Sequence, residues 1–84
     1  MRIIERENRS AEDVKNEIIS CKGKSILISE FNKQGRKIKE YTGEIVDTYA
    51  SVFLVKVNTN NYLINKSFAY VEFLTRDRHY EIQE

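Results

Sequence analysis

A single short helical pattern stands near the start of the sequence, and every later segment has the pattern of a β-strand. Four apolar residues recur at the spacing of one helix face: Ala11, Val14, Ile18 and Cys21. Ser10 and Asp13 match a variant of the capping box, and Gly23 is typical of a helix end because glycine enters the left-handed cap without strain. The sequence therefore predicts one helix over residues 11–22.

The chain beyond Gly23 is rich in β-branched and aromatic residues and is divided by turn sequences. These segments predict strands over residues 25–31, 37–47, 51–57, 62–66 and 79–83. Residues 32–35 and 58–61 are the predicted turns, and the spacing of Phe68, Val71 and Leu74 predicts one helical turn before the last strand.

The predicted second strand carries two irregularities. Ile38 breaks the alternation of apolar and polar residues, which indicates a bulge near Lys39 or Glu40. Gly43 lies inside the same strand and indicates a sharp bend or a close approach of another backbone. A strand bent at Gly43 would allow the sheet to close on itself.

A chain of 84 residues is too short for two domains, and five short strands do not suffice for a two-sheet sandwich. We predict a mainly β fold with one N-terminal helix, a small SH3-like or Sm-like five-stranded barrel. The Val14 and Ile18 side of the helix would close one end of the barrel. Residues 1–9, mostly charged, are predicted to be a flexible arm, and residues 10–84 a single helix-plus-β-barrel domain.

Composition excludes several classes of protein. Fourteen basic against thirteen acidic residues leave a formal charge of +1, so no global field indicates a nucleic-acid or membrane partner. Apolar runs of three or four residues are too short for a membrane span or a signal peptide. One cysteine excludes an intramolecular disulfide, and a cytoplasmic location is expected.

The sequence predicts no enzyme, no catalytic residues, no cofactor, no metal and no small-molecule substrate. With one cysteine and one histidine, a zinc site would need carboxylates or a second chain. Cys21 is expected to pack against the core, and His79 to be solvated. The isolated glycines form no phosphate-binding loop.

Two segments resemble the bacterial Veg family. Residues 43–55, GEIVDTYASVFLV, are similar to its signature segment, and residues 67–75, SFAYVEFLT, to its second motif. Gly23-Lys24 and Gly35-Arg36-Lys37 also stand where the family has glycine next to basic residues, so the resemblance covers residues 12–83. Ala50, Phe68 and Glu72 stand where the family usually has proline, tyrosine and aspartate, as in a divergent member.

The resemblance implies a small cytosolic protein of Gram-positive bacteria with an Sm-like plan. It also implies a role in stimulating biofilm formation through control of transcription. No catalytic residues come with the family. The partner implied is a transcriptional regulator.

Local charge adds a candidate nucleic-acid site. Residues 22–39 contain one acidic residue, Glu30, and six basic residues: Lys22, Lys24, Lys33, Arg36, Lys37 and Lys39. Most flank the predicted turn at residues 32–35, so we expect them at one end of the barrel, where a basic hairpin over residues 33–39 could bind phosphates. Phe31, Tyr41, Tyr49 and Tyr62 could stack on bases, although the alternative is a solvated hairpin with core aromatics.

Protein binding is the function that we favour. An acidic group of Glu40, Glu44 and Asp47 follows the basic hairpin, so self-association in a head-to-tail manner is one route. An exposed edge strand could equally capture a segment of a regulator. The candidate interaction surface consists of Tyr41, Tyr49, Ser51 and Tyr62.

Overall fold

The structure is a computed structural model that describes residues 9–59 and 61–83. It contains two helical segments and five strands. In chain order they are α2 (Ala11–Ser20), β1 (Ser25–Phe31), β2 (Lys37–Thr48), β3 (Val52–Asn58), β4 (Leu63–Ala69), the 3-10 helix η1 (Tyr70–Leu74) and β5 (Arg78–Gln83). All predicted strands are present, with ends that differ by a few residues. The prediction for the N-terminal arm falls outside the described residues, except for Arg9.

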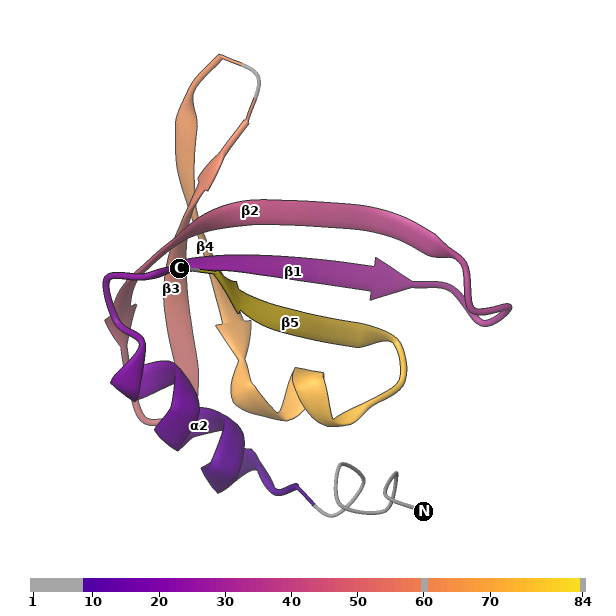
Figure 1. The fold of residues 1–84 in the computed structure, drawn as a ribbon, viewed down its shortest axis with the longest axis horizontal. Coiled ribbons are helices and arrows are strands. Elements are labelled where there is room, and N and C mark those ends of the chain that lie inside the picture. Colours follow the sequence, from indigo (N-terminus) through magenta and orange to yellow (C-terminus); the bar gives the residue numbers. More distant parts are fainter. Residues whose placement is uncertain (1–8, 60, 84) are drawn as a thin grey trace.

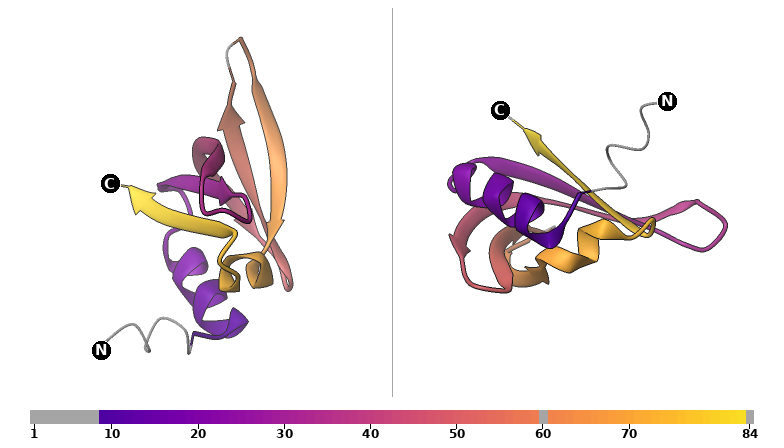
Figure 2. Two further views of the ribbon diagram at one scale, coloured as in Figure 1. Left: turned by 90° about the vertical axis from the view of Figure 1, so that its right-hand side faces the viewer. Right: turned by 90° about the horizontal axis from the view of Figure 1, so that it is seen from below.

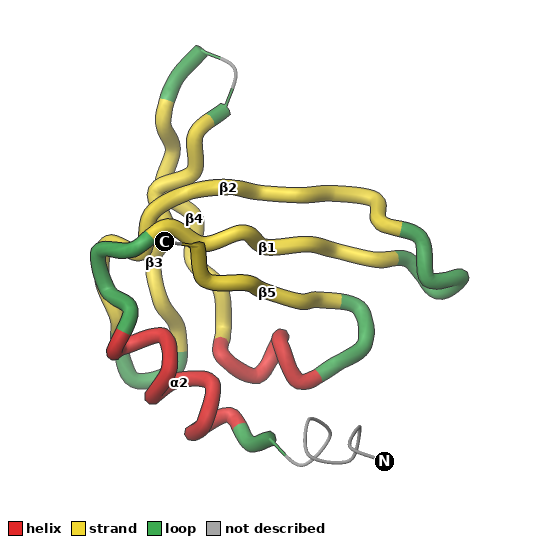
Figure 3. Tube along the Cα trace, in the orientation of Figure 1, coloured by secondary structure: helices red, strands yellow, loops and turns green. Residues whose placement is uncertain are grey.

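The capping box at Ser10 is confirmed. The amide of Asp13 donates to the Ser10 hydroxyl over 3.2 Å, and the Asp13 carboxylate accepts from the Ser10 amide over 3.0 Å. Val14 and Ile18 are fully buried, and α2 packs mainly against η1. Both helical segments lie on the same side of the sheet (Figure 3). The helix ends two residues before the predicted boundary, and Gly23 has the expected positive φ of 92°.

The five strands form one antiparallel sheet in the order β4-β3-β2-β1-β5. β3 and β4 run steeply across β1, β2 and β5 because β2 bends between its two partners (Figure 1). β4 and β5 are the two edges, and among the described residues they do not pair with each other. The mainly β prediction is confirmed, whereas closure into a barrel is not.

Strand β2 contains the predicted irregularities. Glu30 pairs with Lys39 but Phe31 pairs with Lys37, so Ile38 is the extra residue of a bulge, next to the predicted position. A second register shift, at Val46, was not predicted. Gly43 pairs with strands on both sides, Ile26 in β1 and Val57 in β3, which confirms the close backbone approach.

The core lies between the helical segments and the face of the sheet that carries Ile26, Ile28, Ile45 and Val55, which we call the inner face. Phe53 is fully buried, and its ring centroid lies 5.9, 5.5 and 5.8 Å from those of Phe68, Tyr70 and Phe73. Aromatic contacts of this kind add to the burial of apolar surface.

The predicted helical turn is at the right place but shows a different face to the core. Phe68 belongs to β4, which continues beyond the predicted end of that strand to Ala69. Val71 and Leu74 are 57% and 43% exposed, while Tyr70 is buried. The spacing of the apolar residues predicted the position of the helical turn, but the preceding strand β4 determines which side of the turn faces the core. No helix within the described ranges is long and apolar enough to cross a membrane.

Candidate functional site

The six cations of the predicted basic patch form two groups, which corrects the expectation of a single patch. Lys33, Arg36, Lys37 and Lys39 surround the turn between β1 and β2, whereas Lys22 and Lys24 precede β1. Seven residues of β1 separate the groups, a span of roughly 20 Å in an extended strand. The Lys22 ammonium pairs with the Asp47 carboxylate over 3.3 Å, so part of its charge is neutralised.

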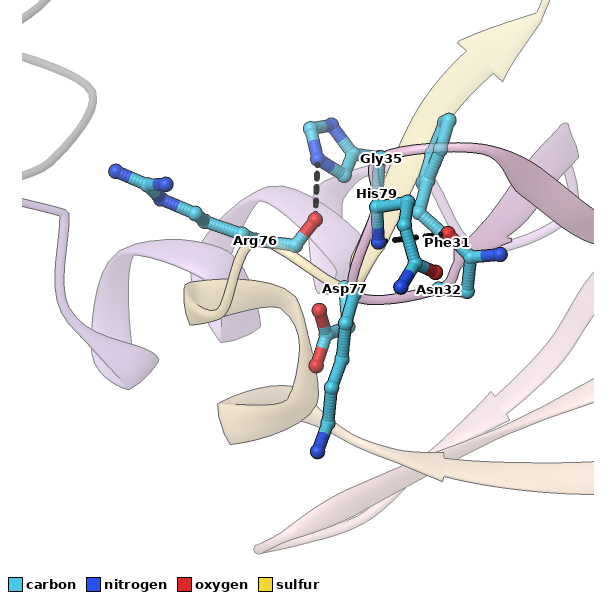
Figure 4. Close-up of a pocket in the computed structure, with 8 residues that line it drawn as sticks. Phe31, Asn32, Gly35, Arg76, Asp77 and His79 are labelled. Carbon is cyan, nitrogen blue, oxygen red and sulfur yellow. Dashed lines mark hydrogen bonds between the residues drawn. The ribbon is translucent and has the colours of Figure 1, made fainter.

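The turn between β1 and β2 is ordered by Asn32. Its side-chain oxygen accepts from the amides of Gln34 and Arg36, both over 2.9 Å, and Gly35 adopts a φ of 85° that favours glycine. The Gly35 amide donates to the Asn32 carbonyl over 3.0 Å (Figure 4). The hairpin projects from the rest of the sheet as a loop of fixed shape (Figure 2).

A shallow depression of about 540 Å³ lies where this turn meets the start of β5 (Figure 4). It is lined by Phe31, Asn32, Lys33, Gln34, Gly35, Arg76, Asp77 and His79. His79 is exposed, as predicted, and its ring packs edge-on against Phe31 with centroids 5.1 Å apart. His79 Nε2 also lies 3.2 Å from the Arg76 carbonyl oxygen, so the imidazole is bound by its own chain.

Two lysines, one of them from the β1–β2 hairpin, lie close to Tyr41 on the inner face. The ammonium groups of Lys39 and Lys66 lie 5.9 and 5.1 Å from the centre of the Tyr41 ring. The same ring packs edge-on against the buried Phe68, with centroids 5.9 Å apart. We call Lys39, Tyr41 and Lys66 the Tyr41 cluster. Lys66 was not among the predicted site residues.

Glu30 and Glu72 bind an arginine of β5. Arg78 in β5 donates to the Glu30 carboxylate over 2.5 Å and also to the carboxylate of Glu72. The Arg78 guanidinium lies 5.9 Å from the centre of the Phe68 ring. Glu30 pairs in register with Lys39, yet its carboxylate is held by Arg78.

The four residues of the predicted interaction surface do not meet. Tyr41 lies on the inner face, Tyr62 is 64% exposed at the end of the β3–β4 hairpin, and Tyr49 and Ser51 flank the turn between β2 and β3. The Tyr49 hydroxyl donates to Asp47 over 3.2 Å, and this bond raises the pKa of Tyr49. The Asp47 carboxylate accepts from the Thr48 amide and binds Lys22, and these contacts lower its pKa.

The β3–β4 hairpin carries an exposed apolar segment, of which only Tyr62 was a predicted site residue. Tyr62, Leu63 and Ile64 are 64%, 56% and 38% exposed. They are consecutive residues of an edge strand and of the turn before it, in a hairpin that projects from the body of the molecule (Figure 1). Apolar residues in a predicted strand indicate burial, so only the position of β4 at an edge of the sheet could have identified these three residues as exposed.

The described residues contain no group of three or more His, Cys, Asp or Glu side chains placed to hold a metal ion. Cys21 is half-buried and packs against the core, as expected, with its Sγ 3.8 Å from the Ser20 hydroxyl.

Comparison with known proteins assigns the family. No curated protein matches the sequence. The family model described as biofilm formation stimulator Veg matches residues 9–80, which include every strand from β1 to β4, the two helical segments and the start of β5. The resemblance seen at residues 43–55 and 67–75 thus extends over most of the chain, which belongs to the Veg family of biofilm formation stimulators.

Proposed function

We propose that this Veg-family chain acts in biofilm formation as a non-catalytic, cytoplasmic regulatory protein that binds a protein controlling transcription. The site proposed is the free edge of β4. The observation that supports it is the run of exposed apolar residues Tyr62, Leu63 and Ile64, which leads into a strand that has a partner on one side only within the described residues.

An edge strand offers unpaired backbone amides and carbonyls to an incoming strand. Among the described residues, β4 pairs only with β3, through Asn58–Leu63 and Val57–Ile64 at the hairpin end. Successive side chains point to opposite faces, so an added strand would contact Leu63 on one face and Ile64 on the other. Backbone hydrogen bonds would supply affinity, and these two side chains would supply specificity.

The free edge of β5 is less suited to this role. Its exposed residues are polar or charged, His79, Glu81 and Gln83, while Tyr80 and Ile82 turn toward the core. Charged and polar side chains at an edge oppose the addition of another strand. The two edges of this sheet therefore differ in chemistry, and only β4 presents large apolar side chains.

The test is a charge placed on the β4 edge. Leu63→Lys should abolish biofilm stimulation when the variant replaces the native protein in a biofilm-forming bacterium lacking its own Veg, because a lysine at an edge opposes strand addition. Val71→Lys is the matched control, since Val71 is 57% exposed against 56% for Leu63 and lies on η1.

Both variants should remain folded, as judged by circular dichroism. The proposal also requires that a partner cross-linked through position 63 be a transcription-controlling protein and be lost in the Leu63→Lys variant. Full biofilm formation with Leu63→Lys, or an equal loss with Val71→Lys, would contradict binding at the β4 edge.

The alternative function, nucleic-acid binding through the basic hairpin at residues 33–39, gains limited support from the hairpin itself. Lys33 and Arg36 are exposed at the turn, but the Lys37 ammonium pairs with the Glu40 carboxylate over 2.7 Å. Exposed ion pairs of this kind contribute little to stability, yet they reduce the field that a phosphate would meet.

A further inference from the structure

The Tyr41 cluster places two ammonium groups close to one aromatic ring. The Lys39 and Lys66 ammonium groups each lie within cation–π distance of the same ring, at 5.9 and 5.1 Å from its centre. Within the described residues, neither ammonium forms an ion pair with a carboxylate. Like charges repel, so an anion placed between them would lower the electrostatic energy of the site.

Glu30 and Glu72 both bind Arg78, so neither carboxylate is paired with the cluster. Glu30 lies opposite Lys39 in the register of β1 and β2, and its carboxylate is 2.5 Å from Arg78 Nη2. Glu72 binds the other terminal nitrogen of the same guanidinium. Because Arg78 is only 27% exposed, this pairing is partly shielded from water, and it leaves Lys39 and Lys66 available to an external anion.

The hydroxyl of Tyr41 is also available. Tyr49, Tyr70 and Tyr80 each donate a hydrogen bond to a protein oxygen, whereas the Tyr41 hydroxyl has no hydrogen-bond partner in the described part of the chain. Tyr41 is half-buried, with its ring against Phe68, so its position is fixed by the core. A fixed hydroxyl on the ring that both ammonium groups approach supplies a hydrogen-bond donor for a phosphate oxygen.

We infer that the Tyr41 cluster binds the backbone of a single-stranded nucleic acid, with a phosphate between Lys39 and Lys66 and a base beside Tyr41. Lys33 and Arg36 continue the positive charge along the same hairpin, which favours a chain of phosphates over a single ion. Single strands expose the base faces that stack on an aromatic ring, which a duplex hides. This site lies on the inner face of the sheet and shares strand β4, through Lys66, with the protein-binding edge proposed above.

The test is fluorescence anisotropy with a labelled RNA strand of about 15 nucleotides, the same sequence as single-stranded DNA, and the DNA duplex. The double variant Lys39→Gln/Lys66→Gln should weaken single-strand binding about tenfold at low salt, because two phosphate contacts are lost. The dependence of log K on log salt should become shallower by about 1.4, at about 0.7 for each contact to a single strand. Tyr41→Phe should weaken binding less, since the ring remains.

Lys56→Gln is the matched control, because Lys56 is an exposed lysine of β3 that pairs with Glu44 and Asn65 on the opposite face of the sheet. It should leave the affinity and the salt slope unchanged. All variants should remain folded, as judged by circular dichroism, because the substituted side chains are exposed or half-buried.

In the direct titrations, three results would overturn the proposal. They are equal losses for the control and the double variant, a duplex that binds as tightly as the single strand, and single-strand binding absent at tens of micromolar protein. Inorganic phosphate and a mononucleotide are added as competitors. If either binds as tightly as the oligonucleotide, the site takes a free phosphate and the nucleic-acid proposal is wrong.

Discussion

Gly43 of β2 lies so close to Lys56 of β3 that no side chain fits between the two strands. A Cβ atom built on Gly43 would lie 2.3 Å from the Lys56 carbonyl oxygen and 2.8 Å from Val55 Cγ1. The obstacle is backbone rather than the end of a flexible side chain. Both β1 and β3 pair with β2 at this residue, so the approach lies at the bend that joins the two halves of the sheet.

Gly43→Ala should therefore destabilise the protein. Forcing extra atoms into a packed site costs about 1–3 kcal/mol, and the cost should fall at the upper end because the carbonyl cannot rotate away. The free energy of unfolding, measured in urea, gives the value. Thr42→Ala, an exposed neighbour on the same strand, serves as the control and should change stability by about 0.5 kcal/mol or less. Equal stability of Gly43→Ala and the native protein would contradict the close approach.

Features that depend on nearby residues were predictable from the sequence. The Ser10–Asp13 capping box, the left-handed Gly23 and the turn at Asn32 each depend on contacts within a few positions. A bulge near Lys39 or Glu40 was predicted from a break in alternation, and it lies next to that position, at Ile38; the constraint on Gly43 was predicted from a glycine in a strand. In each case residues within a few positions determine the local conformation, and the structure has that conformation.

Features that depend on strand curvature and on contacts across the sheet were not predictable. Lys66 reaches Tyr41 only because β4 crosses the inner face, and no sequence pattern relates positions 25 residues apart on strands that are not neighbours. The exposure of Leu63 follows from the position of β4 at an edge. For the same reason the closed barrel was not confirmed, because closure requires pairing of β4 with β5.

Phe53→Ala should unfold the protein or leave it close to unfolding. Phe53 is fully buried and contacts the rings of Phe68, Tyr70 and Phe73. Truncation of a buried phenylalanine costs about 3–5 kcal/mol, a large share of the stability of a small domain. Thermal unfolding followed by circular dichroism measures the loss, and Ile38→Ala, at a residue that is 58% exposed, should have almost no effect. A native melting temperature for Phe53→Ala would place this ring outside the core.

The contact between α2 and β5 should make stability depend on pH at both ends of the scale. Burial, and then a hydrogen bond to Glu17, raise the pKa of Tyr80 to about 12. The bond from Tyr80, and then the bond from Arg9, lower the pKa of Glu17. The raised pKa of Tyr80 adds to the free energy of unfolding below pH of about 10, and this contribution is lost as pH rises toward about 12. The lowered pKa of Glu17 adds to the free energy of unfolding at pH above its usual pKa of 4.5, and this contribution is lost as pH falls below that value.

Tyr80→Phe separates this contact from the other titrating groups. The free energy of unfolding is measured in urea across the pH range for both proteins, and the difference between the two curves is taken. The difference should be largest near neutral pH and should shrink both above pH of about 10 and below about 4. A difference that does not vary with pH would show that the Tyr80 hydroxyl does not interact with Glu17 in solution.

Arg78→Gln should destabilise the protein more than removal of the whole ion pair. The Arg78 and Glu30 side chains are 27% and 19% exposed, so the single variant leaves the Glu30 carboxylate partly buried without its cation. Loss of one partner of a buried charged pair costs about 3–5 kcal/mol when burial is complete, and about 1–3 kcal/mol is expected at this exposure. The double variant Arg78→Gln/Glu30→Gln carries no unpaired carboxylate at that position and should recover part of the loss. Urea unfolding of the two single variants and the double variant gives the coupling energy, and additive losses would mean that Arg78 and Glu30 do not stabilise one another.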